Sequence, residues 1–162
     1  MANFSLFKTR LGNATAFRWF LLTKVPAAFF AGVRLQKLEI DESVISVSYK
    51  WFNKNPFRSV YFAVLMMPGE ISTGILCIGH LYKREPAVSM LLIRTEGDFL
   101  KKATGKIVFT CSDGMMINDA INKAVTTGEA TTVNCHSIGR NEQNEIVADF
   151  HFTWSFKTRK RR

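Results

Sequence analysis

The chain is poor in cysteine, and the few cysteines it has are not paired. Cys77, Cys111 and Cys135 are odd in number and show no CxxC spacing. This pattern excludes a disulfide framework and a structural zinc site built on cysteine pairs. Unpaired thiols are typical of a reducing compartment, which predicts a cytoplasmic protein.

Histidine is equally scarce. The chain contains His80, His136 and His151, and no two of them have metal-ligand spacing with a supporting cysteine or acid. We therefore expect no metal and no cofactor. His151 follows Asp149 on the polar face of a predicted strand, which indicates a surface or interface position.

Acidic residues are outnumbered, with 13 Asp and Glu against 22 Lys and Arg and a net charge of +9. Five of the basic residues fall in the last six positions, so the body is only mildly basic, which suits an anionic small ligand. We interpret residues 158–162 as a solvated basic tail. No strand interleaves aromatic and basic residues as a single-strand binder would, so no nucleic-acid partner is expected.

The chain also lacks repeats and linkers. A length of 162 residues with 47% hydrophobic residues predicts one domain, residues 1–157, before the tail. Apolar residues near the N-terminus recur at helical spacing, while Lys24 and Pro26 interrupt the apolar run that a signal peptide would need. We expect a docked amphipathic helix, with Phe4, Phe7, Leu11, Ala14, Phe17 and Leu21 on its apolar face.

Residues 55–80 form a nearly continuous apolar segment that carries one carboxylate, Glu70. As a helix it reaches about 39 Å, and its apolar residues cover every face, as in a helix wrapped by other structure. Pro68 should kink or divide it. A membrane span is the alternative, and Glu70 and the pair Pro68-Gly69 argue against it, so no span is expected. A buried carboxylate must be paired, protonated or at work in a cleft.

Strand-like runs surround this segment. A hairpin is predicted at residues 34–40 and 43–51, and further strands at 88–95, 104–112, 129–138 and 145–157. In the last run the apolar face alternates with a polar one. A short helix at 115–125, capped by Asp113 and closed by Gly128, is expected between the second and third of these four later runs. About six antiparallel strands curved around a long helix define an α+β hot-dog fold.

On this element order and three segments, the chain resembles the hot-dog acyl-CoA thioesterases of the phenylacetate-degradation type, and more closely a bacterial branch of that superfamily. The segments are 24–32 (KVPAAFFAG), 55–59 (NPFRS) and 70–74 (EISTG), and the resemblance covers roughly residues 30–157. It implies a homodimer or a dimer of dimers with its sites at the subunit interface. The substrate it implies is the thioester of an acyl-CoA or of an acyl-carrier protein.

The resemblance also implies site residues. An Asn before the central helix and an acid within it commonly face one site, and Asn55 and Glu70 stand 70 − 55 = 15 positions apart. Ser89 is the nearest candidate for the Ser or Thr that often joins them. Where catalytic members usually carry His-Gly-Gly, this chain has Tyr61-Phe62-Ala63. A Phe in place of the glycine can crowd the approach of a backbone N–H to the thioester oxygen.

Each candidate has a chemical role and a structural alternative. Glu70 can act as a general base on water or attack directly to give an anhydride; the alternative is an ion pair with Arg58 or Arg94. Asn55 can orient the water, or it can simply be a turn residue before a proline. For Ser89 the alternative is an ordinary polar strand residue.

The remaining candidates bind substrate. The amide of Tyr61 or Phe62, at the start of the central helix, is the candidate oxyanion donor, and Arg58 lies beside them. The candidates for the phosphates of coenzyme A are Arg94, Lys101 and Lys102, which can equally form a solvated rim.

The predicted function is hydrolysis or binding of an acyl thioester. The first rival is a non-catalytic acyl-CoA or lipid-binding module, favoured by Tyr61-Phe62-Ala63. The second is a hot-dog dehydratase or hydratase, which would need a histidine paired with the acid, and no histidine precedes His80.

Overall fold

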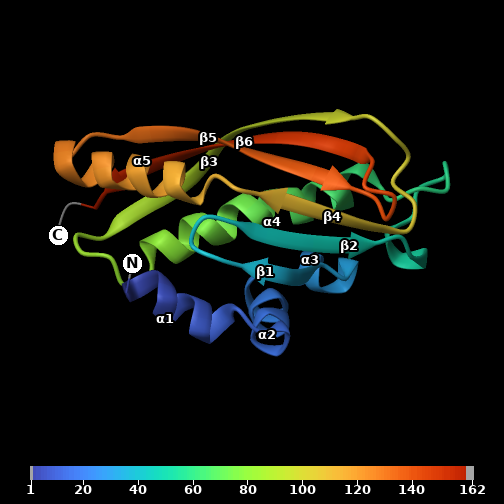
Figure 1. Cartoon of the computed structure of the whole chain (residues 1–162), viewed down its shortest axis with the longest axis horizontal. Helices are drawn as coiled ribbons and strands as arrows, with labels where there is room; N and C mark the ends of the chain where they lie inside the picture. The colour runs from blue at the N-terminus through green and yellow to red at the C-terminus, as the bar shows by residue number, and fades with distance from the viewer. Residues whose placement is uncertain (1, 160–162) are drawn as a thin grey trace.

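A curved antiparallel sheet wraps one long helix (Figure 1). The computed structural model describes residues 2–159, and within this range six strands form one sheet in the order β1-β2-β4-β5-β6-β3. The strands are β1 (Arg34–Leu38), β2 (Ser43–Ser48), β3 (Val88–Phe99), β4 (Lys106–Cys111), β5 (Thr131–Arg140) and β6 (Ile146–Thr158). This is the predicted α+β hot-dog architecture, with β1 and β3 as the two edges.

The long helix is α4 (Phe62–Leu81), and it forms the centre of the core. By length and composition it could cross a membrane, with a mean hydropathy of 1.6, but 67% of its most apolar window is buried inside the fold. Three buried hydroxyls tie it to the sheet: Ser43 Oγ donates to the Ser72 carbonyl, and the Oγ atoms of Ser72 and Ser137 lie 2.7 Å apart. The helix is therefore a core element of a globular domain.

The start of α4 differs from the prediction. The helix begins at Phe62 and not at Asn55, because the segment before it folds into a loop held by the Asn55 side chain. Pro68 was predicted to kink the helix or to divide it. It does not divide the helix, since α4 runs unbroken through Pro68. Pro68 removes one helical N–H, and packing of the sheet around the helix outweighs that loss.

The strand predictions are confirmed in kind and shifted at their ends. On β6 the apolar face is buried from Ala148 to Phe156, and the opposite face from Asp149 to Lys157 remains at least partly exposed. β3 extends four residues beyond its predicted end at Thr95. The second hairpin arm stops at Ser48, and Trp51–Asn53 forms a 3-10 helix, η1.

The N-terminal segment forms three helices where one was predicted. These are α1 (Ala2–Leu11), α2 (Ala14–Lys24) and α3 (Pro26–Ala31). The break after α1 follows from Asn13, whose Oδ1 caps α2 by accepting from the Ala16 amide at 2.8 Å. Of the six residues predicted for the apolar face, Phe4, Phe7, Phe17 and Leu21 are buried, whereas Leu11 is partly buried and Ala14 is exposed.

The last helix, α5 (Gly114–Thr127), ends at Gly128 in a left-handed conformation with φ of 74°, as expected of its closing glycine. Asp113 precedes the helix but does not cap it. Instead, its Oδ2 accepts the His136 amide at 2.6 Å. Of the predicted tail, Thr158 ends β6 and the Arg159 amide donates to the Ala87 carbonyl, while residues 160–162 lie outside the described residues.

Candidate active site

Glu70 lies midway along α4 in a small apolar cavity. The cavity holds about 80 Å³. Its walls come from α2 and the turn after it, from α4, and from the strands β3 and β6. The lining residues besides Glu70 are Phe20, Val25, Ile71, Gly74, Ile75, Ile78, Met90 and Trp154. The space is large enough to admit water.

The carboxyl group of Glu70 has no charged partner in the part of the chain that the structure describes. Burial raises its pKa from 4.5 to about 7, and desolvation is the cause. Trp154 is the polar neighbour in the cavity wall, but its Nε1–H donates to Thr73 Oγ1 at 2.9 Å. Neither of the ion pairs suggested for Glu70, with Arg58 or with Arg94, forms in this chain. Arg94 pairs with Glu96 at 2.7 Å, and no ion pair of Arg58 is found within residues 2–159. Glu70 is therefore poised to exchange a proton near neutral pH.

The Asn55 side chain organises the loop before α4. Its Oδ1 accepts from the amides of Phe57 and Ser59 at 3.0 and 3.1 Å, and its Nδ2 donates to Ser59 Oγ at 3.0 Å. This is the geometry of an Asx turn, which follows from an Asn directly before a proline. The loop-forming alternative for Asn55 is thus present in the structure.

The first turn of α4 offers backbone donors next to this loop. The Tyr61 amide donates to the Asn53 carbonyl at 2.8 Å and is therefore not free to bind substrate. Phe62, the first residue of α4, has an amide without a helical partner, and no acceptor for it is found among the described residues. Of the two amides predicted as oxyanion donors, that of Phe62 is the one available to bind a substrate oxygen.

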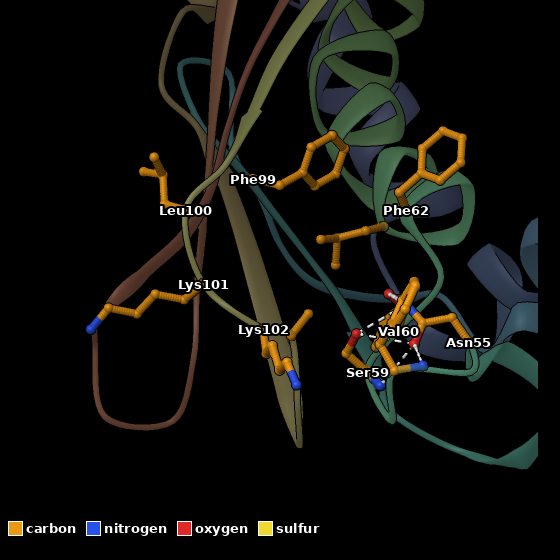
Figure 2. A pocket seen from close by; sticks show the side chains of 11 residues that line it. Asn55, Ser59, Val60, Phe62, Phe99, Leu100, Lys101 and Lys102 are labelled. Carbon is orange, nitrogen blue, oxygen red and sulfur yellow. Dashed lines mark hydrogen bonds between the residues drawn. The ribbon is translucent and has the colours of Figure 1, made fainter.

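A larger pocket of about 380 Å³ lies between this loop and the end of β3 (Figure 2). Asn55, Phe62, Lys101 and Lys102 all line it, together with Phe99, which meets the Phe62 ring edge to face at 6.1 Å. The structure thus brings four of the predicted site residues together. Glu70 lies in the smaller cavity described above. It follows Phe62 by eight residues of α4, which is about 12 Å along the helix axis at about 1.5 Å per residue.

The predicted phosphate-binding cations differ in their surroundings. Lys101 extends away from the pocket and pairs with Glu145 at 2.6 Å (Figure 2). Arg94 is exposed on β3 and occupied by Glu96. Arg58 belongs to the Asn55 loop, where its amide donates to the Asn55 carbonyl at 3.2 Å and its backbone is left-handed with φ of 60°. For Lys102 no ion pair is found among residues 2–159, which makes it the available cation at the rim of the larger pocket.

Ser89 lies apart from both pockets. Its Oγ donates to the Lys157 carbonyl at 3.0 Å on the neighbouring strand, and it is the next residue, Met90, that lines the Glu70 cavity. Since successive residues of a strand point to opposite faces, Ser89 points away from Glu70.

Sequence reasoning missed two groups of residues. Asn53 is buried, and its Nδ2 donates to the carbonyls of Ser48 and Ala31 at 2.8 and 3.2 Å, which anchors the loop that carries Asn55. The polar face of the sheet also brings His136 and His151 together beside Asp149. The Asp-x-His spacing on one strand was the available signal for this cluster, but the pairing of β5 with β6 was needed to add His136.

The fold and these pockets define a hot-dog domain with an acidic residue buried in its central helix. No protein-family model matches the chain, and no curated protein matches it by sequence. Solved structures do match it. A probable thioesterase of unknown function from Pseudomonas aeruginosa is 19% identical, with a TM-score of 0.76 over 91% of this chain and 97% of that one.

Two further solved structures share the fold. A thioesterase from Haemophilus influenzae is 13% identical with a TM-score of 0.62, covering 90% of this chain and 91% of that one. A variant of a thioesterase from Staphylococcus aureus is 12% identical with a TM-score of 0.62, covering 82% and 99%. At these identities the likeness establishes the fold.

Proposed function

We propose that this protein is a thioesterase that hydrolyses the thioester of an acyl-CoA or an acyl-carrier protein, with Glu70 as its acid and base. The observation that carries the proposal is a carboxyl group in an apolar cavity with no cationic partner among residues 2–159 and with its pKa raised to about 7. A structural carboxylate would be expected to have a partner. The thioesterases among the solved structures of the same fold support the choice of substrate class.

Hydrolysis of a thioester adds water across the carbon–sulfur bond. In the first route, ionised Glu70 takes a proton from a water molecule as that water attacks the carbonyl carbon, and it returns the proton to the departing thiolate. In the second, the carboxylate attacks the carbonyl carbon, expels the thiolate and forms an anhydride that water then cleaves. A pKa near the working pH serves the first route, because the group must both accept and donate.

The proposed site is completed by a second copy of the chain. Glu70 lies near Met90 at the start of β3, whereas the pocket of Asn55 and Phe62 lies at Phe99, the end of that strand. β3 is a free edge of the sheet. Antiparallel pairing of two β3 strands about a twofold axis puts the start of one against the end of the other. Glu70 of one protomer then faces the Asn55 loop and the Phe62 amide of its partner.

The apolar character of β3 supports this pairing. Leu91, Ile93 and Phe99 on β3, and Leu100 directly after it, are between 48% and 65% exposed in the single chain. Exposed apolar side chains on an unpaired strand are the usual mark of an interface. In such a dimer Lys102 and Arg58 lie beside the proposed site and can meet the phosphates of coenzyme A.

A cytoplasmic location belongs to this proposal as well. Cys77, Cys111 and Cys135 are all free and buried, as expected of a protein kept in a reducing compartment.

The test is an assay of the purified protein against a panel of acyl-CoAs. Release of the free thiol measures hydrolysis. We expect turnover that falls about 100-fold to 10,000-fold in Glu70→Gln, the usual contribution of a general acid–base group. Glu129→Gln removes an exposed acid and should retain full activity. In single-turnover hydrolysis in ¹⁸O-labelled water, label found in Glu70 would identify the anhydride route, because general-base hydrolysis places label in the product acid alone.

A wild-type protein that hydrolyses no acyl-CoA yet is stabilised by one would overturn the proposal in favour of the binding module. Activity retained by Glu70→Gln would remove Glu70 from the mechanism.

A further inference from the structure

The outer face of the sheet carries a cluster of metal-ligating side chains separate from the Glu70 cavity. Asp149 and His151 stand two residues apart on β6 and therefore project from the same face. His136 on β5 is the direct cross-strand partner of His151. Their ligand atoms all lie within 4.8 Å of one another.

The two imidazole rings lie face to face beside the carboxylate. Their centroids are 4.5 Å apart with an angle of 2° between the planes. Both rings turn Nε2 toward the same oxygen, with His136 Nε2 at 2.6 Å and His151 Nε2 at 3.7 Å from Asp149 Oδ1. One carboxylate oxygen is thus approached by two imidazole nitrogens.

Asn134 determines which nitrogen of His151 carries the proton. Asn134 Nδ2 donates to Thr153 Oγ1 at 3.2 Å, which directs its Oδ1 to His151 Nδ1 at 2.9 Å. Because Oδ1 is an acceptor, Nδ1 must be the donor, and neutral His151 then holds its lone pair on Nε2. His151 Nε2 lies 3.7 Å from Asp149 Oδ1, beyond hydrogen-bond distance, so its lone pair is available to a metal ion. Asp149 Oδ1 itself is hydrogen-bonded to His136 Nε2 at 2.6 Å.

The three ligand atoms lie close enough for small side-chain movements to bring them onto one metal ion. In a tetrahedral zinc site with bonds of about 2.0–2.1 Å, neighbouring ligand atoms are about 3.3 Å apart. Binding would therefore part His136 Nε2 from Asp149 Oδ1, now hydrogen-bonded at 2.6 Å, and draw in His151 Nε2 from 3.7 Å. The stacked rings would also tilt, because imidazole lone pairs lie in the ring plane. The hydrogen bond from His151 Nδ1–H to a side-chain oxygen is the outer-shell contact that orients metal-bound histidines.

We propose that His136, Asp149 and His151 form a binding site for one divalent transition-metal ion of the zinc type. Two imidazoles and one carboxylate are ligands that Zn²⁺, Co²⁺ and Ni²⁺ accept. The side chains are 38%, 31% and 45% exposed, so an ion reaches the site from solvent and keeps water in the remaining position. The site belongs to a single chain and does not depend on the thioesterase proposal.

Co²⁺ titration of the tag-free protein at pH 7.5 tests the site, with visible absorption as the signal and Zn²⁺ competition as confirmation. We expect one ion per chain and a d–d spectrum free of the sulfur charge-transfer band that cysteine ligands would produce. Zn²⁺ should also raise the melting temperature by mass action. His136→Asn, His151→Asn and Asp149→Asn should each abolish the spectrum.

Two further variants separate coordination from general electrostatics. Asp98→Asn removes the exposed acid on β3 directly opposite Asp149 and should weaken metal binding much less than Asp149→Asn, because it removes a nearby charge and no ligand. Asn134→Ala keeps all three ligands but removes the bond that orients His151, and should weaken Co²⁺ binding about 10-fold to 100-fold. The absence of a spectral change at a large excess of Co²⁺ would overturn the proposal. Equal losses in Asp98→Asn and Asp149→Asn, or a sulfur charge-transfer band, would do so as well.

Discussion

At the scale of single residues, Glu70 combines burial with the lack of any cation to stabilise its charge, as far as residues 2–159 show. Its folded-state pKa of about 7 lies above the value of 4.5 in the unfolded chain. The folded protein therefore holds this proton more tightly than the unfolded chain does. Protonated Glu70 therefore contributes to the free energy of unfolding. This contribution is fully present below pH 4.5 and is lost as the pH rises through 7.

Glu70→Gln should consequently stabilise the protein at alkaline pH. A pKa difference of about 2.5 corresponds to roughly 3 kcal/mol at pH 8, whereas at pH 4 the two proteins should differ little on this account. The measurement is urea denaturation of both proteins at several pH values. Glu129→Gln is the control, and a Glu70→Gln curve parallel to the wild type from pH 4 to 8 would contradict the shifted pKa.

At the scale of elements, the close approach of α4 to the sheet depends on a glycine. A Cβ added at Gly69 would lie 2.7 Å from Phe150 Cδ2, too near for two carbon atoms. Phe150 is fully buried against both α4 and β4, where its ring stacks on Phe109 at 5.4 Å, so it has little room to move. The absence of a side chain at position 69 is what allows this contact.

Gly69→Ala should therefore destabilise the protein although alanine favours helices. The gain in helix propensity is about 1 kcal/mol, and overpacking a core typically costs about 1–3 kcal/mol, so we expect a small net loss. Chemical denaturation measures it.

A double-mutant cycle with Phe150→Leu identifies the cause. If the clash is responsible, Gly69→Ala should cost less in the Phe150→Leu background than in the wild type. Equal costs in the two backgrounds would point to another origin.

At the scale of the whole molecule, the edge strand β3 joins the two pockets. The Glu70 cavity and the Asn55 pocket touch opposite ends of this strand. Ile93 stands near its midpoint, 51% exposed, at an irregularity in the pairing with β6. A twofold axis at the midpoint would bring two copies of Ile93 together.

Ile93→Lys should convert the proposed dimer to a monomer, because it would place two ammonium groups side by side at the axis. Light scattering coupled to size-exclusion chromatography measures the molecular mass. If each site contains residues of both protomers, thioester hydrolysis should be lost together with the dimer. Leu6→Lys, an equally exposed apolar position on α1, is the control and should remain dimeric. A wild-type monomer with full activity would refute the composite site.

Much of the fold could be predicted from local pattern. The alternation on β6, the all-round apolar character of α4 and the turn chemistry of Asn55-Pro56 each express a preference of neighbouring residues. Where prediction failed, a local signal competed with tertiary packing, as when α4 continued through Pro68. Helix ends also depended on single side chains such as Asn13.

The sequence by itself determined the architecture and singled out Glu70, because periodicity and burial of an acid in an apolar run are visible in the order of residues. The tertiary structure alone decided what surrounds Glu70, which amide at the start of α4 is free, and that His136 meets His151. Those facts depend on contacts between residues far apart in the chain. Sheet register and helix docking create such contacts, and neither is written in the spacing of neighbouring residues.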